Sequence, residues 1–173
     1  MVAAREAKSL SEERTYDTDL TNPDDIDRAL LQRAEGVSRE LRRAGLAART
    51  VHLKVRTGSF TTWTRAMTLP RPTDLAEDLV EAARRLFAQR IDLAGQGVRL
   101  LGVGVSGLEP GGGGQATLFT DGRDERVRRA SRAADAIRAR LGPEAVTRAR
   151  LLRPRQPDDD DAPPEASSPP SVD

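Results

Sequence analysis

Four segments of the chain have the hydrophobic and polar pattern of β-strands. They are residues 8–20, 50–57, 60–69 and 98–108. In the second, Val51, Leu53 and Val55 alternate with His52, Lys54 and Arg56, so one face is apolar and the other cationic. In the fourth, Leu101, Val103 and Val105 alternate with Leu100, Gly102 and Gly104. Thr57, Gly58 and Ser59 are expected to form a turn, and Pro70 and Pro72 to end the third strand.

Three other segments have the period of amphipathic helices. The first has Asn22 as N-cap, Pro23 at its first position and Gly45 at its end. Its apolar face is formed by Ile26, Leu30, Ala34, Val37 and Leu41. Asp74 and Glu77 resemble a capping box for a second helix, whose apolar line is Leu75, Leu79, Ala82, Ala83, Leu86 and Phe87. A third helix is expected from Asp124 to Leu141, with an apolar line of Val127, Ala130, Ala134, Ile137 and Leu141.

The order β-α-β-β-α-β predicts an α+β fold of the split βαβ kind. We expect a four-stranded antiparallel sheet with two helices on one face and the other face open. The expected organisation is a linker remnant (1–7), this domain (8–109), a Gly-rich tether (110–123), a C-terminal helical segment (124–152) and an acidic, Pro-rich tail (153–173). The composition of the tail predicts disorder.

Charge and composition narrow the classes of function. The chain of 173 residues has a formal net charge of +1. Residues 153–173 hold two Arg, five Asp and one Glu, a charge of −4, so the rest carries +1 − (−4) = +5. It has no cysteine and one histidine, which disfavours thiolate chemistry, zinc sites and His-based triads, so we expect no metal and no cofactor. The chain lacks a long apolar run, which favours a cytoplasmic protein without a membrane partner.

The carboxylates of the chain do not converge on a catalytic pattern. Asp24, Asp25, Glu77 and Asp78 fall in first helical turns, where capping explains them, and Asp158–Asp161 lie in the acidic tail. The stretch GVGVSG has the pattern of a strand interior, and no Gly-Lys-Ser/Thr follows it. We therefore expect no enzymatic activity of this chain alone.

The open sheet face has two interpretations. It is an ordinary solvated face, or it is a platform where Lys and Arg neutralise phosphates while hydroxyls and glycine-exposed amides donate hydrogen bonds. Stacking of single-stranded bases is disfavoured because Phe60 and Trp63 would lie on opposite faces.

The stretches KSLSEERTYDTDL, LRRAGLAARTVHLKVRTGSFTTWTRAMTLPRPTD and VRLLGVGVSGL together resemble the little finger domain of Y-family translesion DNA polymerases, most of all the bacterial polymerase IV type. The resemblance covers about Ala7 to Leu108. It implies a DNA-binding domain whose open sheet lies along the major groove of damaged DNA and holds the primer and template backbones. The implied phosphate contacts are Lys8, Ser9, Ser11, Arg56, Thr57, Thr62, Thr64, Arg65 and Arg99. Leu100 and Gly104 stand where relatives often carry basic residues, which implies weaker affinity for DNA.

The segment GGGGQATLF (111–119) places two large apolar residues after a flexible stretch. Gln115, Leu118 and Phe119 resemble the peptide with which bacterial relatives dock on the sliding clamp. The alternative is that Leu118 and Phe119 pack the third helix onto the domain.

The resemblance also implies that a catalytic core with palm, fingers and thumb precedes this region. Met1 stands close to the expected linker, so we expect a stand-alone accessory domain, an excised piece, or the downstream part of a broken reading frame. A catalytic core encoded separately is then a further expected partner. The alternative function is a DNA-independent protein-interaction module of ferredoxin-like fold.

Overall fold

The predicted β-α-β-β-α-β order is confirmed in the computed structural model, which describes residues 9–111 and 122–151. The domain consists of β1 (Ser9–Leu20), α1 (Pro23–Ala44), β2 (Leu46–Thr57), β3 (Thr62–Thr73), α2 (Ala76–Arg90) and β4 (Val98–Pro110). It is followed by α3 (Gly122–Leu141) and two short 3-10 helices, Pro143–Ala145 and Ala149–Leu151. No helix in this part of the chain is both long and apolar enough to cross a membrane.

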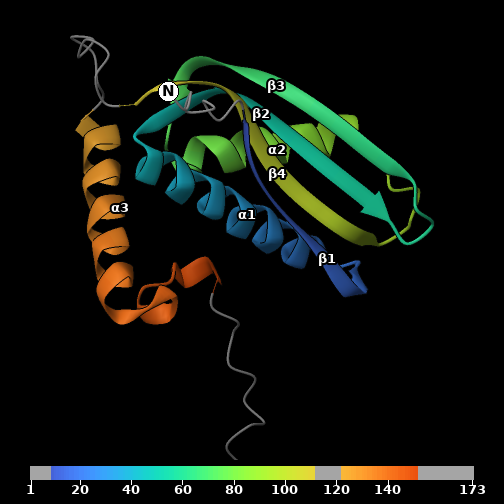
Figure 1. Ribbon diagram of the computed structural model, residues 1–173. Coiled ribbons are helices and arrows are strands. Elements are labelled where there is room, and N and C mark those ends of the chain that lie inside the picture. The colour runs from blue at the N-terminus through green and yellow to red at the C-terminus, as the bar shows by residue number, and fades with distance from the viewer. Residues whose placement is uncertain (1–8, 112–121, 152–173) are drawn as a thin grey trace, which may run out of the picture.

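The four strands form one antiparallel sheet in the order β1-β4-β2-β3. Helix α1 connects β1 to β2 across β4, and α2 connects β3 to β4 across β2, so each crossover encloses one strand. Both helices lie on the same side of the sheet (Figure 1). The predicted split βαβ arrangement with one covered face is therefore confirmed.

The covered face holds the core. The six residues predicted to point toward the helices are fully buried: Val51, Leu53, Val55, Leu101, Val103 and Val105. The apolar stripe of α1 meets them, with every member at most 6% exposed. Because a slip of one residue would turn every side chain to the other face, this burial fixes the register of the sheet.

Helix α1 begins and ends at the predicted residues. The Asn22 side chain accepts a hydrogen bond from the Asp24 amide at 2.8 Å, and Pro23 is the first helical residue. Gly45 ends the helix in the left-handed conformation, with φ 65°. Both ends are thus set by local sequence.

We expect Asn22→Ala to lower the free energy of unfolding by about 1 kcal/mol, because the Asp24 amide loses its capping acceptor. Urea denaturation measures the change. Asn22→Asp keeps an acceptor oxygen and is the control, expected to match the wild type within a few tenths of a kcal/mol. An equal loss in both variants would contradict the capping role.

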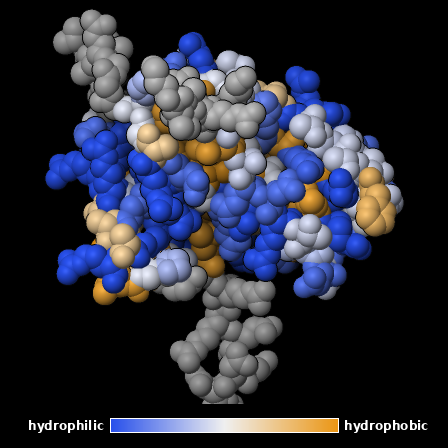
Figure 2. Space-filling view, in the orientation of Figure 1, coloured by the Kyte–Doolittle hydropathy of each residue, from blue (hydrophilic) through white to orange (hydrophobic). Residues whose placement is uncertain are grey.

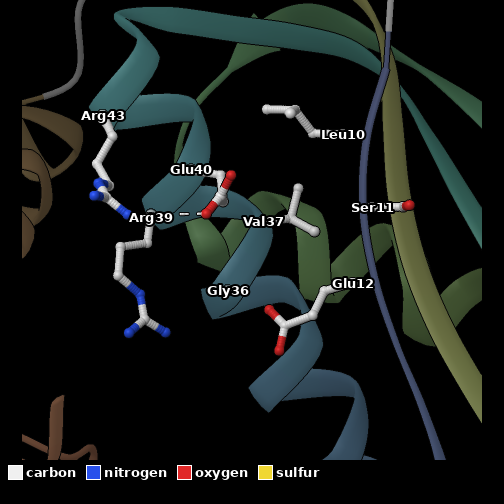
Figure 3. Close-up of a pocket in the computed structure, with 8 residues that line it drawn as sticks. All are labelled: Leu10, Ser11, Glu12, Gly36, Val37, Arg39, Glu40 and Arg43. Carbon is white, nitrogen blue, oxygen red and sulfur yellow. Dashed lines mark ion pairs between the residues drawn. The ribbon is translucent and has the colours of Figure 1, made fainter. Parts of the chain in front are cut away.

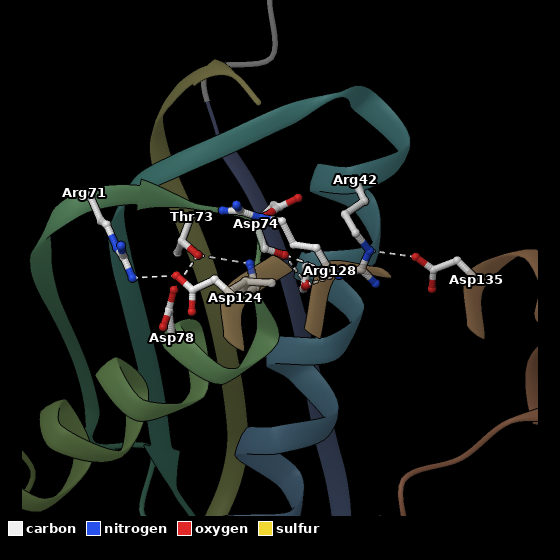
Figure 4. A network of polar contacts seen from close by, with 10 residues as sticks. Arg42, Arg71, Thr73, Asp74, Asp78, Asp124, Arg128 and Asp135 are labelled. Atoms are coloured by element: carbon white, nitrogen blue, oxygen red, sulfur yellow. Dashed lines mark hydrogen bonds and ion pairs between the residues drawn. The ribbon is translucent and has the colours of Figure 1, made fainter. Parts of the chain in front are cut away.

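The capping box predicted for α2 is wrong. The helix begins at Ala76 with Leu75 as N-cap and has no side-chain cap. Thr73 Oγ1 instead accepts from the Leu75 amide at 3.1 Å and donates to Asp78 at 2.6 Å. The Asp74 carboxylate is held by Arg128 of α3, so it is engaged away from the helix start (Figure 4).

The third strand does not end at Pro70. β3 runs through Pro70 and Pro72 to Thr73. It is an edge strand, and its pairing with β2 is irregular between Thr68 and Thr73. Proline is tolerated there because the ladder demands no amide hydrogen at those positions.

Helix α3 begins at Gly122, two residues before the predicted start, and its apolar line is only partly covered: Val127 and Ala134 are half-buried and the other three members are exposed. Ile137 is 41% exposed and Leu141 is 75% exposed. Ion pairs join this helix to the domain instead, among them Arg42 with Asp135 and Arg71 with Asp124, each at 2.7 Å (Figure 4). The apolar line of this helix is therefore largely exposed, and ion pairs attach the helix to the domain.

Candidate nucleic-acid interface

The open face of the sheet is built from rows of residues paired across the four strands. The register between neighbouring strands defines each row. From one end of the sheet to the other, the rows are Ser9–Ser106–Thr50–Thr68, Ser11–Gly104–His52–Ala66, Glu13–Gly102–Lys54–Thr64 and Thr15–Leu100–Arg56–Thr62. We call these sixteen positions the open face. Of the residues implied as phosphate contacts, the register brings together Ser9, Ser11, Arg56, Thr62 and Thr64.

Hydrogen bonds orient several of these side chains. Arg56 Nε donates to Thr62 Oγ1 at 2.9 Å, which aligns the guanidinium along the end of the sheet. His52 Nε2 and Ser106 Oγ lie 2.7 Å apart. Lys54 Nζ forms an ion pair of 3.0 Å with Glu13. The face is thus rich in hydroxyl groups and carries Lys54 and Arg56 against one carboxylate.

Two glycines leave the middle of the open face recessed, because they carry no side chains. Gly102 and Gly104 lie under a shallow hollow of about 410 Å³, bordered by Ser11, His52 and Lys54. β4 is hydrogen-bonded to strands on both sides, so its amides serve the ladder rather than a ligand. The expectation that these glycines offer free amides is therefore wrong. What they supply is space for a close approach.

Two implied contacts do not lie on the open face. Thr57 is fully buried, with Oγ1 2.9 Å from Ser59 Oγ, because it continues the inward alternation of Val51, Leu53 and Val55 along β2. Arg65 pairs with the buried Leu53 and so points to the helix side of β3. It shares the phase of Trp63, not that of Thr64. Both residues are removed from the candidate interface.

Arg99 is the extra residue where the pairing of β4 with β2 is irregular, and it forms an ion pair with Asp19 of β1. The hydrogen bond that Arg99 Nε donates to the Asp19 carboxylate, reinforced by the charge of Asp19, raises the pKa of the Arg99 guanidinium. Asp19 therefore offsets a charge that the resemblance assigned to a phosphate. The sequence analysis did not predict the acidic partners of the two cations, Asp19 of Arg99 and Glu13 of Lys54. The alternation of Ser9, Ser11 and Glu13 along β1 nevertheless indicates that Glu13 lies on the open face.

Four implied binding residues lie outside the described residues: Lys8, and Gln115, Leu118 and Phe119 of the clamp-like segment. Among the described residues, Phe60 is an exposed aromatic residue that the sequence analysis did not predict. It lies at the β2–β3 turn, 72% exposed, with φ 65°.

A second hollow, of about 360 Å³, lies on the other side of β1, between that strand and α1 (Figure 3). Glu12, Arg39, Glu40 and Arg43 line it, and Arg43 pairs with Glu40 at 4.0 Å. This hollow is separate from the open face, since Glu12 points toward the helix side, where it pairs with Arg33. Its charges are mixed, so it does not extend the cationic surface.

Comparison with known proteins assigns the chain to a family. Residues 7–118 match the impB/mucB/samB family C-terminal domain. The chain belongs to this family. The matched range of the impB/mucB/samB C-terminal domain contains all four strands and both sheet-covering helices, whereas α3 follows it. The resemblance inferred from the sequence is confirmed.

Relatives carry the name DNA polymerase IV. The chain is 48% identical over 108 residues to DNA polymerase IV of Streptomyces coelicolor, covering 62% of this chain and 22% of the relative. It is 37% identical over 142 residues to DNA polymerase IV 1 of Mesorhizobium japonicum, covering 82% and 32%. The chain therefore spans a third or less of these two relatives. A solved complex of a beta-clamp processivity factor and the little finger domain of PolIV matches with 25% identity and a TM-score of 0.48, covering 64% of this chain and 98% of the other.

Proposed function

We propose that the open face binds the sugar–phosphate backbone of primer–template DNA, without reading bases, as the accessory domain of a translesion DNA polymerase. The observation that carries this proposal is the arrangement of hydroxyl groups around Lys54 and Arg56 over a glycine floor. Family membership supports it, because the relatives are named as DNA polymerases.

The chemistry of the open face suits phosphates rather than base edges. Serine and threonine hydroxyls donate to phosphate oxygens, and cations release counterions from the backbone. Lys54 forms an ion pair with Glu13, and Arg99 forms one with Asp19, so little net positive charge is left to attract phosphates. Weak, sequence-independent binding follows.

We expect the chain to bind two primer–templates of unrelated sequence with similar affinity and a steep dependence on salt. Fluorescence anisotropy between about 25 and 200 mM salt measures both properties. A log–log slope well below zero supports backbone contact, since each phosphate neutralised contributes about 0.9. A DNA-independent interaction module, the alternative function, predicts no binding even at the lowest salt.

We further propose that Gln115, Leu118 and Phe119 dock this chain on a sliding clamp. The sequence supports this by placing two apolar anchors and one amide directly after four glycines and the last strand. Apolar anchors that fill a preformed pocket supply most of the energy of such a peptide, and the amide adds hydrogen bonds.

Nucleotide transfer is proposed to belong to a catalytic core outside these residues. The family match covers the C-terminal domain, and the chain spans 32% of the Mesorhizobium relative. The role proposed for this chain is to hold DNA and the clamp while that core reacts. Primer extension by this chain alone would contradict the assignment.

A further inference from the structure

Helix α3 lies beyond the family match, so the role of the sheet does not explain it. Its domain-facing side is held by charged groups. Asp124 pairs with Arg71 of β3 at 2.7 Å, and Asp135 pairs with Arg42 of α1 at 2.7 Å (Figure 4). These pairs reach two separate elements of the domain, and so they fix which side of the helix faces outward.

Two arginines on the domain-facing side of α3 also form ion pairs. Arg128 Nε lies 3.1 Å from Asp74 Oδ1, and Arg138 Nη1 lies 3.3 Å from Asp135 Oδ1. Residues 124, 128, 135 and 138 fall within about 80° of the helix circumference. The charges on the inner side are therefore balanced by partners in the domain or on the helix itself.

The outer side of α3 carries an unbalanced row of arginines. Arg126, Arg129, Arg132 and Arg140 are all exposed and fall within about 120° of the circumference. Among the side chains that the structure describes, which are those of residues 9–111 and 122–151 without 123, 144 and 150, no carboxylate forms an ion pair with these arginines, and Arg126 donates to the Gly122 carbonyl of its own helix. Glu125 is the one acidic residue on this side, at the first turn. Hydrophilic residues gather along α3 in Figure 2.

We propose that the outer face of α3 (Arg126, Arg129, Arg132 and Arg140) is a second binding surface for the phosphate backbone of DNA. The proposal rests on the proposed function for the identity of the polyanion. It extends that function, because this helix is neither part of the sheet nor part of the family match.

The shape of the row favours a nucleic-acid backbone over an acidic protein. The four arginines span about 21 Å along the helix, a length over which duplex DNA presents many phosphates. Ala133 and Ala136 are the apolar residues of α3 that fall within this arc, whereas protein interfaces centre on large buried anchors. Ile137 and Leu141 lie toward one end of the row.

The test replaces all four arginines by glutamine in the full chain and measures DNA binding by anisotropy as a function of salt. We expect the log–log slope to become less steep by about 2–4 units, since up to four phosphate contacts are lost. The side chains are exposed and unpaired in the described structure, so the circular dichroism spectrum and melting temperature are expected to stay unchanged.

A matched control removes the same charge elsewhere, with Arg39, Arg43, Arg85 and Arg90 of α1 and α2 changed to glutamine. Its slope is expected to stay within about one unit of the wild type. Equal losses in both variants would overturn the proposal in favour of a bulk charge effect. A wild-type slope in the α3 variant would overturn it too, including the case in which the acidic tail occupies these arginines.

A third variant separates this proposal from the proposed function. In Lys54→Gln with Arg56→Gln, the open face loses its cations while α3 is intact. If this variant loses affinity and the α3 variant does not, the second surface is refuted and the sheet interface stands. If the α3 variant alone loses affinity, the second surface stands and the sheet interface is refuted. Absence of wild-type binding refutes both.

Discussion

Leu53→Ala is expected to lower the free energy of unfolding by about 2–5 kcal/mol. Leu53 is fully buried in the middle of β2, opposite Val103 of β4. Its truncation removes the transfer free energy of the side chain and leaves a cavity between the sheet and the helices. Urea or thermal denaturation measures the loss.

The neighbouring residue provides the control. Lys54 follows Leu53 on the same strand but lies on the open face, where its ion pair with Glu13 is half exposed. Lys54→Ala is expected to change stability by less than about 1 kcal/mol. The reverse order of effects would mean that the sheet is shifted by one residue, and that the open face is a different set of side chains.

The second large effect concerns the clamp-like segment. We expect Leu118→Ala with Phe119→Ala to abolish binding to a sliding clamp, because buried anchors often contribute about 2 kcal/mol or more each. A peptide of residues 112–120 is expected to bind the clamp nearly as well as the whole chain. Surface plasmon resonance on immobilised clamp measures both, with Thr117→Ala, at a variable position of the pattern, as the matched control.

The alternative role of this segment predicts the opposite outcome. If Leu118 and Phe119 pack α3 onto the domain, their truncation costs about 2–5 kcal/mol of stability. Under the clamp proposal the melting temperature of the double variant stays near that of the wild type. A large fall in melting temperature with unchanged clamp affinity would refute clamp docking.

The fold was predictable because its signals are local. Alternation around Leu53 and Leu101 gave the strand phases, and Asn22 and Gly45 gave the ends of α1. In a split βαβ order, both helices then pack on the same face of the sheet. Each of these inferences needs only residues that are near one another in the chain.

The site was predicted less well because some residues were assigned against their strand phase and others depend on pairing between distant strands. Arg65 was assigned to the interface by resemblance, although it alternates in phase with Trp63 and faces the helix side. Thr57 was also assigned by resemblance, although it has the phase of Val51, Leu53 and Val55 and lies on the buried face. Glu13 and Asp19 neutralise Lys54 and Arg99 across 41 and 80 residues of chain.

The position of α3 on the domain also depends on contacts between residues that are far apart in the chain. Its helical period was visible in the sequence, but its apolar line is largely exposed. The contacts that hold it are ion pairs such as Arg42 with Asp135, 93 residues apart. Periodicity identifies a helix and its faces, whereas the choice of face depends on charges contributed by the rest of the fold.

The most direct test of the central claim is a charge reversal on the open face. Lys54→Glu with Arg56→Glu is compared with Arg85→Glu and Arg90→Glu, an equal change on the helix-covered side. We predict that the open-face variant, still folded by circular dichroism, loses at least about tenfold in affinity for primer–template DNA at low salt, with a slope flatter by about two units. The control is predicted to keep most of the wild-type affinity and slope. DNA binding by the open-face variant that equals the wild type at every salt concentration would contradict the account.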